Sequence, residues 1–526
     1  MLPVLTRADY NAPMLLTGRL RRLAPEWPVL AVAALAIGAR LLPTPRTIDD
    51  AFITFRYARN LVAGAGFVYN LGERVLGTTT PLYTLLLAAL AGLSGSENYP
   101  WLALLVNSLA DALTCGLLAA LGRRLTGRRA VGLAAALLWA VAPMSVTFAI
   151  GGMETSVCIL GLTATAWAYL TGRPRWTAAA AALTLLTRPD AALLIAPLLL
   201  DWVARSLRAR AIPWAAVGLF AGVLAPWVIF AVLYFGSPWP HSLAAKALAY
   251  RLQPTEAAVR LLQHYGTPFF EDALCGPRWP LVGVTLYLAL SIIGGLAMIR
   301  REPRAWLVAL YPWLYGVVFA AANPLIFRWY LAPPLPFYYL TILAGLNALA
   351  HDLARALRLP AGAARAGWGL PALAACALLL NGWTLRPDHG PQSPAPKMAW
   401  HQLELYYTRL GQELARRVTP RTVIAAGDVG ALGYYSNARI LDTVGLMSPE
   451  ATAYYPLPAD QYVINYAMPA QLILAARPDF VVLLEVYGRR SLLPDPDFQA
   501  AYALEQTAPT DIYGSRGLLV YHRRSP

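Results

Sequence analysis

Residues 101–121 read WLALLVNSLADALTCGLLAAL, and this stretch decides the class of fold that the sequence predicts. An α-helix needs roughly 20 mostly apolar residues to cross a bilayer. The stretch is long enough, and Asp111 is the one ionisable residue inside it. We therefore expect a transmembrane helix here, in a chain whose other apolar segments repeat the same pattern.

The composition of the whole chain agrees with a membrane protein. Of its 526 residues, 58% are hydrophobic and only 13% are charged, and the mean hydropathy is +0.48. A soluble chain would carry about twice that share of charge. The net charge of +15 comes mainly from arginine, and no long basic run of the nucleic-acid-binding kind is present. The four cysteines lack metal-ligand spacing and three lie in apolar stretches, so neither a disulfide framework nor a zinc site is indicated.

Arginine clusters orient the candidate spans, because cytoplasmic loops collect basic residues. Placing every cluster inside predicts eleven crossings, a cytoplasmic N-terminus and an extracytoplasmic C-terminus in the plasma (inner) membrane. Segment 81–93 is short and would break the alternation, so we expect a re-entrant or juxtamembrane helix there, with a full crossing as the alternative. The clusters are 123–129, 173–175, 205–210, 300–304 and 355–365. The spans are 27–42, 101–121, 131–150, 155–170, 176–186, 191–203, 214–235, 281–298, 305–322, 329–349 and 368–385.

The predicted fold class is an all-α polytopic membrane domain followed by an extracytoplasmic α/β domain. Residues 1–385 form the first and residues 386–526 the second. Two long loops, 43–80 and 236–280, share the outer side with the second domain. We therefore expect the residues of an extracytoplasmic active site to come from these three segments.

The C-terminal tail has the pattern of a small soluble domain. Its charged content is ordinary, and short apolar runs at 422–426 and 480–484 alternate with helix-like stretches such as 400–418. A proline-rich segment, 386–396, is the predicted linker to the membrane domain.

The first outer loop carries a pair of adjacent carboxylates just past the first span, in the stretch TIDDAFITFRYARN (47–60). Thr47 or Asp49 can cap a helix that runs to about Ala63, since acidic residues are favoured in a first turn. Asp49 and Asp50 can also supply a general base, or bind a divalent cation such as Mg²⁺, Mn²⁺ or Ca²⁺. The pair alone leaves these interpretations open.

The helical spacing of this loop distributes its side chains over different faces. Phe52 and Phe55 would lie off the charged face, so a helix in the membrane interface could press them into lipid. Arg56 and Arg59 have planar guanidinium groups suited to a phosphate, or they extend toward lipid headgroups. The charged face itself carries Asp49, Ile53, Arg56 and Asn60.

With these residues, the sequence resembles the GT-C superfamily of membrane glycosyltransferases. Within it, the chain is most similar to bacterial proteins of the mycobacterial terminal β-(1→2) arabinofuranosyltransferase type. The first loop is the most specific part: DDAFITFRYARN (49–60), GFVYN (66–70), GERV (72–75) and TTPL (79–82). Shorter motifs follow in order along most of the chain: GMET (152–155), TRPD (187–190), YFGSP (234–238), AK (245–246), RWYL (328–331), GDVG (427–430), YYS (434–436) and DTVGL (442–446).

The resemblance implies an enzyme that transfers a sugar from a polyprenyl-phosphate donor to an acceptor hydroxyl at the outer face, with inversion. The sugar would be an arabinofuranose or a hexose, and the acceptor an envelope glycan, glycolipid or protein. Asp49 or Asp50 would be the catalytic base. Candidates for the donor phosphate are Arg56, Arg59, Lys246 and Arg328. Candidates for other substrate contacts are Tyr57, Asn60, Glu73, Thr80, Glu154, Arg188, Asp190, His241 and Tyr330.

Structural roles compete with these assignments. Glu154 can cap a helix at a short loop, and Arg188 and Asp190 can simply neutralise each other beside Pro189. His241 departs from the family pattern, where Asn-Thr is usual, which weakens an acceptor contact there. The tail residues Asp428 and Asp442 are expected at a turn and a strand end.

The main alternative function is a transporter or flippase for a lipid-linked saccharide, and a non-catalytic scaffold is the third. A transporter should carry ionisable groups in the middle of its spans. Here Asp111 is the notable exception, whereas Asp49, Asp50, Glu154 and Arg188 gather at one predicted face. This asymmetry favours chemistry at the membrane surface.

Overall fold

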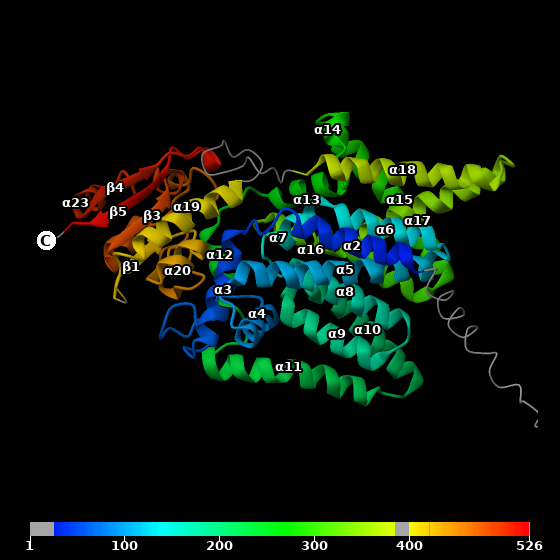
Figure 1. The fold of residues 1–526 in the computed structure, drawn as a ribbon, viewed down its shortest axis with the longest axis horizontal. Coiled ribbons are helices and arrows are strands. Elements are labelled where there is room, and N and C mark those ends of the chain that lie inside the picture. Colours follow the sequence, from blue (N-terminus) through cyan, green and yellow to red (C-terminus); the bar gives the residue numbers. More distant parts are fainter. Residues whose placement is uncertain (1–25, 384–398, 420, 525–526) are drawn as a thin grey trace, which may run out of the picture.

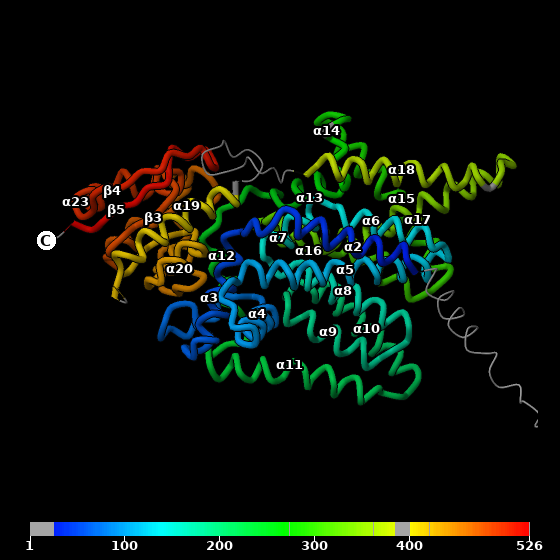
Figure 2. The backbone as a smooth tube through the Cα atoms, in the orientation of Figure 1, coloured from blue at the N-terminus to red at the C-terminus, as the bar shows by residue number. Residues whose placement is uncertain are grey.

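The computed structural model describes residues 26–383, 399–419 and 421–524. It has a bundle of helices with a small α/β domain at one end (Figures 1 and 2). Helices α3 and α12 lie where the two parts meet. The boundary predicted at residues 385 and 386, and the linker 386–396, lie outside the described residues.

The helical part follows the apolar segments closely. In chain order it contains α2 (Trp27–Leu41), α3 (Asp49–Val62), α4 (Pro81–Ser94), α5 (Tyr99–Thr126), α6 (Arg129–Val141), α7 (Pro143–Ile150), α8 (Thr155–Leu170), α9 (Pro174–Thr187), α10 (Ala192–Ala209), α11 (Trp214–Phe235), α12 (His241–Ala249), α13 (Glu256–Gly266), α14 (Asp272–Cys275), α15 (Trp279–Arg301), α16 (Trp306–Ala322), α17 (Leu335–Ala356) and α18 (Ala361–Asn381). Short 3₁₀ turns include η1 (Pro189–Ala191) and η3 (Arg328–Leu331).

The chain is a multi-pass membrane protein by the length and apolar character of these helices. Among the described residues, five helices are long and apolar enough to cross a membrane, or six if α6 and α7, which meet at a 48° bend, form one span. Shorter apolar helices include α2, α4 and α8. The eleven crossings and their orientation therefore stay a prediction, as does the re-entrant path of α4.

One predicted span differs from the structure at its beginning. The sequence places a span at 329–349, but α17 begins only at Leu335, after the 3₁₀ turn η3. Pro333 and Pro334 precede the helix, and a proline removes a backbone donor and restricts the residue before it. The first residues of the segment are thereby left free to face the junction with the α/β domain.

Glycines allow the bundle helices to approach closely. A Cβ on Gly122 of α5 would lie 2.3 Å from the Cα of Gly132 of α6. Likewise, a Cβ on Gly294 of α15 would lie 2.0 Å from the carbonyl oxygen of Thr341 in α17. Small residues at such contacts are typical of helices that pack within a membrane.

The C-terminal part confirms the predicted α/β character. A five-stranded sheet has the order β2-β1-β3-β5-β4, with β1 parallel to β2 and β3, and β5 antiparallel to β3 and β4. Its strands are β1 (Val423–Ala426), β2 (Arg439–Asp442), β3 (Phe480–Leu484), β4 (Tyr502–Ala508) and β5 (Leu518–Arg523). Its helices are α19 (Ala399–Leu414), α20 (Gly430–Ser436), α21 (Ala470–Ala476), α22 (Glu485–Gly488) and α23 (Pro496–Ala501).

The two faces of the sheet belong to different cores, because successive strand residues point to opposite sides. Ile424, Ala426 and Val482 are buried in a core that is continuous with the helical bundle. Ala425 and Val481 belong to a separate small core with residues of α21 and α23. The α/β domain is thus packed onto the bundle by a full sheet face with its helices α19 and α20.

Candidate functional site

The two carboxylates at the start of α3 have different environments. The side chain of Asp49 accepts hydrogen bonds from the backbone N–H groups of Gly430 and Ala431, each at 2.8 Å. It therefore caps α20 of the C-terminal domain, since the first N–H groups of a helix lack partners within the helix. Burial and the nearby Asp428 raise the pKa of Asp49, against the opposing effect of these two donors. The expected capping of α3 by Thr47 or Asp49 is wrong, because Ile48 is the N-cap residue and makes no side-chain bond.

Asp50 lines a cavity of about 560 Å³ at the junction of the bundle and the α/β domain. Adjacent residues of a helix point about 100° apart, so a helix whose Asp49 reaches α20 presents Asp50 elsewhere. The cavity wall also includes residues just before α4 and α8, residues just after α9, part of α12, and residues from the end of α16 to η3. Its charged lining consists of Asp50, Glu154, Arg188, Asp190 and Lys246.

Arg188 is held in place by two carboxylates. Its Nε and Nη2 donate to the two oxygens of Asp190 at 2.9 Å each, and its Nη1 donates to Glu154 at 3.1 Å. The guanidinium carbon also lies 5.0 Å from the ring centre of Tyr330. The predicted mutual neutralisation of Arg188 and Asp190 therefore exists, and it fixes Arg188 on the cavity wall.

Lys246 is the other cation of the cavity. Its ammonium lies 4.7 Å from the ring centre of Phe327, and no described residue forms an ion pair with it. Burial alone would lower the pKa of Lys246, but Tyr330, Asp50 and Glu154 outweigh it and raise the pKa. The side chain is therefore charged at neutral pH and available to an anion in the cavity.

The three predicted phosphate-binding arginines lie outside the cavity lining. Arg56 donates to the carbonyl of Ala438 at 2.7 Å, and Arg59 donates to the carbonyl of Tyr434 at 2.9 Å. Arg328 lies over the ring of Trp400, with 5.6 Å between guanidinium carbon and ring centre. All three contact the C-terminal domain, which sequence spacing could not reveal because their partners lie far along the chain.

The predicted position of the α3 aromatics in lipid is wrong. Phe52 and Phe55 are fully buried, and Phe52 packs against the rings of Tyr434 and Tyr435 at 5.2 and 5.4 Å. Burying an aromatic ring is favourable in a protein core as well as in lipid. The spacing of aromatic residues on one helix therefore cannot distinguish a buried helix from one that lies on the membrane. Helix α3 is therefore a bridge between the domains rather than a helix lying on the membrane.

The other predicted substrate residues fall into two groups. Thr80, Glu154, Arg188, Asp190 and Tyr330 line the cavity with Asp50. The remaining four have structural contacts away from its lining. These are Tyr57, which donates to the Val75 carbonyl; Asn60, which donates to the Val68 and Tyr69 carbonyls; Glu73, which pairs with Arg439; and His241, whose backbone N–H donates to the Leu76 carbonyl.

Several polar residues of the cavity were not predicted from the sequence, although Thr54, Thr79 and Trp329 lie within the quoted motifs. Tyr250 lies four residues after Lys246 and therefore on the same side of α12, a spacing that could have indicated it. The others have nothing that distinguishes them from ordinary polar residues. They are Thr54, Thr78, Thr79, Ser242, Asn323 and Trp329.

A metal site at the aspartate pair finds no support in the arrangement of the side chains. Both oxygens of Asp49 already accept backbone N–H groups. Over residues 26–383, 399–419 and 421–524, no three His, Cys, Asp or Glu side chains are grouped so as to hold a metal ion. The arrangement of the two carboxylates suits them to accept protons and hydrogen bonds.

Asp428 and Asp442 occupy a turn and a strand end in the C-terminal domain. Asp442 accepts backbone N–H groups of Val444, Gly445 and Met447, which closes the turn after β2. Asp428 accepts the hydroxyl of Tyr407 at 3.0 Å. Burial raises the pKa of Asp428 to about 6, and that of Asp442 also to about 6.

The raised pKa of Asp428 predicts a pH-dependent loss of stability. In the unfolded chain an aspartate titrates near ~3.9, so between that pH and about 6 the folded protein holds one proton more. Stability therefore falls as pH rises through this window. We expect Asp428→Asn to raise the free energy of unfolding at pH 7.5 by roughly 1–3 kcal/mol and to have little effect below about pH 4. Thermal unfolding in detergent at both pH values checks this, with the exposed Asp460→Asn as control; a gain that is equal at both pH values contradicts it.

The same fold occurs in a protein of known structure. ArnT from Cupriavidus metallidurans, in a crystal structure with bound undecaprenyl phosphate, aligns with a TM-score of 0.55 and 13% identity over 95% of this chain and 98% of that chain. The same protein in the apo state gives a TM-score of 0.55 at 14% identity. The chain therefore has the fold of ArnT, and this finding supports the predicted resemblance to the GT-C superfamily.

One curated protein is similar to this chain in its amino-acid sequence. Over 221 residues the chain is 31% identical to the terminal β-(1→2)-arabinofuranosyltransferase of Mycobacterium tuberculosis. The match covers 38% of this chain and 35% of that protein, so it spans about a third of the relative's length. Residues 396–521 match a family described as a domain of unknown function (DUF8728).

Proposed function

We propose that the protein is a glycosyltransferase that moves a sugar from a polyprenyl-phosphate donor to an acceptor hydroxyl. The observation that carries the proposal is the cavity at the domain junction, where the carboxylate of Asp50 and the cation of Lys246 line the same space. A transfer of this kind needs one group that accepts the acceptor's proton and another that stabilises the departing phosphate. The ArnT structure with undecaprenyl phosphate supports a donor of this chemical class.

Asp50 acts as the general base in this mechanism. It removes the proton of the acceptor hydroxyl as the oxygen attacks the anomeric carbon, and the bond to the phosphate breaks on the opposite face with inversion. Asp49 is less suited to this role because two backbone N–H groups already occupy its oxygens. Holding base, acceptor and donor in line supplies much of the rate enhancement.

Lys246 and Arg188 supply positive charge for the phosphate that leaves. Lys246 forms no ion pair with a carboxylate of the described residues, whereas Arg188 is paired with both Glu154 and Asp190. We therefore assign the main phosphate contact to Lys246, and a positioning role to Arg188. The sugar is an arabinofuranose or a hexose, and the acceptor an envelope glycan, glycolipid or protein on the outer face.

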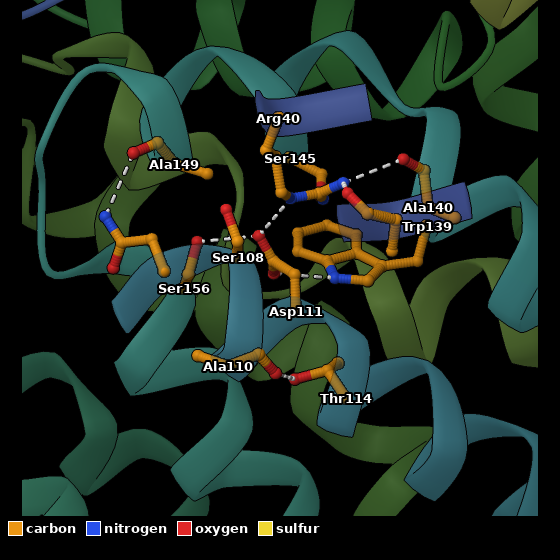
Figure 3. Close-up of polar contacts among 12 residues, drawn as sticks. Arg40, Ser108, Ala110, Asp111, Thr114, Trp139, Ala140, Ser145, Ala149 and Ser156 are labelled. Atoms are coloured by element: carbon orange, nitrogen blue, oxygen red, sulfur yellow. Dashed lines mark hydrogen bonds and ion pairs between the residues drawn. The ribbon is translucent and has the colours of Figure 1, made fainter. Parts of the chain in front are cut away.

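A transporter of lipid-linked saccharides is less well supported. Its strongest sequence indication is Asp111 in the middle of α5. That carboxylate is fully buried and bonded to Arg40, Trp139 and Ser156 (Figure 3). A carboxylate with three partners and no exposure is suited to a structural role rather than to a cycle of protonation and release.

The Lys246→Gln variant tests the phosphate assignment. We expect its KM for a polyprenyl-phosphate sugar to rise about 10- to 100-fold, because a charge-assisted contact contributes roughly 1.5–3 kcal/mol. Purified protein in lipid is assayed against a panel of such donors with radiolabelled sugars. The matched control is Arg251→Gln, an exposed cation five residues away that does not line the cavity.

Three outcomes would contradict these proposals. An unchanged KM for Lys246→Gln would remove the phosphate assignment alone. Absence of transfer from every donor, together with donor-dependent movement of the lipid-linked sugar across a vesicle membrane, would favour the transporter. Cytoplasmic labelling of a cysteine introduced near Asp428 would place the cavity on the other side of the membrane.

A further inference from the structure

A second cavity lies at the other end of the long helix α5. Its volume is about 750 Å³, and the last turns of α5 form part of its wall together with the start of α2 and the end of α15. Helix α5 has 28 residues and is therefore about 42 Å long, enough to reach across a whole bilayer. Its first residue, Tyr99, contacts Tyr434 of the C-terminal domain. The second cavity thus lies at the end of α5 that points away from the C-terminal domain.

The wall of the second cavity carries an excess of positive charge. Four arginines and two glutamates line it: Arg123, Arg124, Arg129, Arg301, Glu26 and Glu302. The same arginines belong to the clusters that the sequence places at the cytoplasmic side. The positive-inside rule accounts for their side of the membrane, but not for their meeting around one cavity.

Carboxylates within the cavity neutralise only part of this charge. Arg124 pairs with Glu302 at 2.8 Å, whereas Arg129 approaches Glu26 only to 4.0 Å. One terminal nitrogen of Arg129 is buried and has no hydrogen-bond partner among the described residues. A buried donor without a partner costs free energy, so a further acceptor at this nitrogen would be favourable.

The two remaining arginines are also available. Nε of Arg301 donates to the carbonyl of Arg124 at 3.1 Å. Arg123 has no ion pair or hydrogen bond from its side chain within the part of the chain that the structure describes. Guanidinium groups match the geometry of phosphate oxygens, so an anion here can bind several at once.

The rest of the wall is apolar, so the cavity favours an anion that also carries an apolar group. Val29, Ala119, Ala120 and Trp167 line the cavity beside the arginines. Gly116 also lines it, and a Cβ added there would meet no atom within 4 Å. A ligand that fits both parts of the wall carries a phosphate next to aliphatic chains, and basic pockets between transmembrane helices are typical sites for such headgroups.

We propose that this cavity binds the headgroup of an anionic phospholipid from the bilayer. The phosphate lies among Arg123, Arg129 and Arg301, and the first carbons of the acyl chains lie along α5 beside Gly116. The site is separate from the cavity that contains Asp50. It would tie the stability of the α2, α5 and α15 contact to the lipid composition of the membrane.

Lipid-dependent unfolding of the full-length protein tests the proposal. Delipidated protein in detergent is titrated with phosphatidylglycerol, with phosphatidylcholine or with inorganic phosphate, and bound lipid is counted by native mass spectrometry. Two variants probe the site: Arg123→Gln/Arg301→Gln removes charge, and Gly116→Leu fills the cavity without changing charge. The matched control is Arg358→Gln/Arg365→Gln, two exposed arginines of the same predicted side that do not line the cavity.

We expect phosphatidylglycerol to raise the unfolding temperature of the wild type and of the control by several degrees, and phosphatidylcholine to have a much smaller effect. Both site variants should bind phosphatidylglycerol about tenfold more weakly. Equal stabilisation by phosphatidylcholine, or unchanged binding in Gly116→Leu, would overturn the proposal. A full shift with inorganic phosphate alone would also overturn it, by assigning the cavity to a soluble anion.

Discussion

The Asp50→Asn variant is expected to lose sugar transfer by a factor of about 100 to 10,000, which is the usual contribution of a general base. Asparagine has the shape of aspartate but cannot take the proton of an acceptor hydroxyl. Asp50 lines the cavity, whereas Asp49, Arg56 and Arg59 make the hydrogen bonds that join α3 to the C-terminal domain. The unfolding temperature of the variant should therefore equal that of the wild type, and its KM for the donor should change little.

Asp49→Asn is the matched control, because the same chemical change falls one residue earlier on the same helix. An asparagine offers one acceptor oxygen where two N–H groups of α20 need partners, so we expect a loss of roughly 1–3 kcal/mol in stability. Transfer and thermal unfolding are measured on both variants in the same lipid. Full activity of Asp50→Asn, or a loss of transfer in Asp49→Asn with stability intact, would move the base away from Asp50.

The second large effect is expected at the ion pair inside the bundle. Arg40 and Asp111 are both 0% exposed, and Nε of Arg40 donates to Asp111 at 2.7 Å. Arg40 also donates to the carbonyls of Ala36 and Ala140 and to the hydroxyl of Ser145, and Figure 3 shows Ala140 and Ser145 beside the pair. Removing one partner leaves a buried charge uncompensated, which typically costs about 3–5 kcal/mol.

We therefore expect Asp111→Leu and Arg40→Met each to lower the free energy of unfolding by about 3–5 kcal/mol. The double replacement Arg40→Met/Asp111→Leu should recover much of this loss, since it removes both charges and leaves apolar side chains in a dry core. The control pair is Arg355 and Asp352, which are 80% and 67% exposed, and its removal should cost at most about 1 kcal/mol.

Denaturant unfolding in mixed micelles measures these differences. A double variant as unstable as the sum of the single ones would mean that the pair is not coupled. Single variants of wild-type stability that lack transport or transfer would instead return Asp111 to a functional role. The cycle therefore also tests the structural interpretation that weighs against a transporter.

Helices and strands could be predicted where a continuous apolar run along the chain marks them. The runs 422–426 and 480–484 correspond to β1 and β3, and the span 214–235 corresponds to α11 with the same bounds. The strands β2, β4 and β5 escaped prediction because each buries at most three consecutive residues, so their apolar runs are short. The start of α17 escaped because hydropathy does not register what prolines do to the backbone.

The sequence by itself determined that the chain is a polytopic membrane protein with an α/β tail and an acidic pair in its first loop. It also supplied the motifs that resemble GT-C glycosyltransferases. Composition and short motifs suffice for this, because burial in lipid and helix formation depend on residues that are close along the chain.

Only the tertiary structure decided what each member of those motifs contacts. It separated Asp49, which caps α20, from Asp50, which lines the cavity with Lys246. It also placed Arg56 and Arg59 on the C-terminal domain, about 380 residues along the chain. Side chains from distant segments meet only when the chain packs, and a helix turns neighbouring residues to different sides. No local sequence pattern could therefore predict that Asp49 and Asp50 have different contacts.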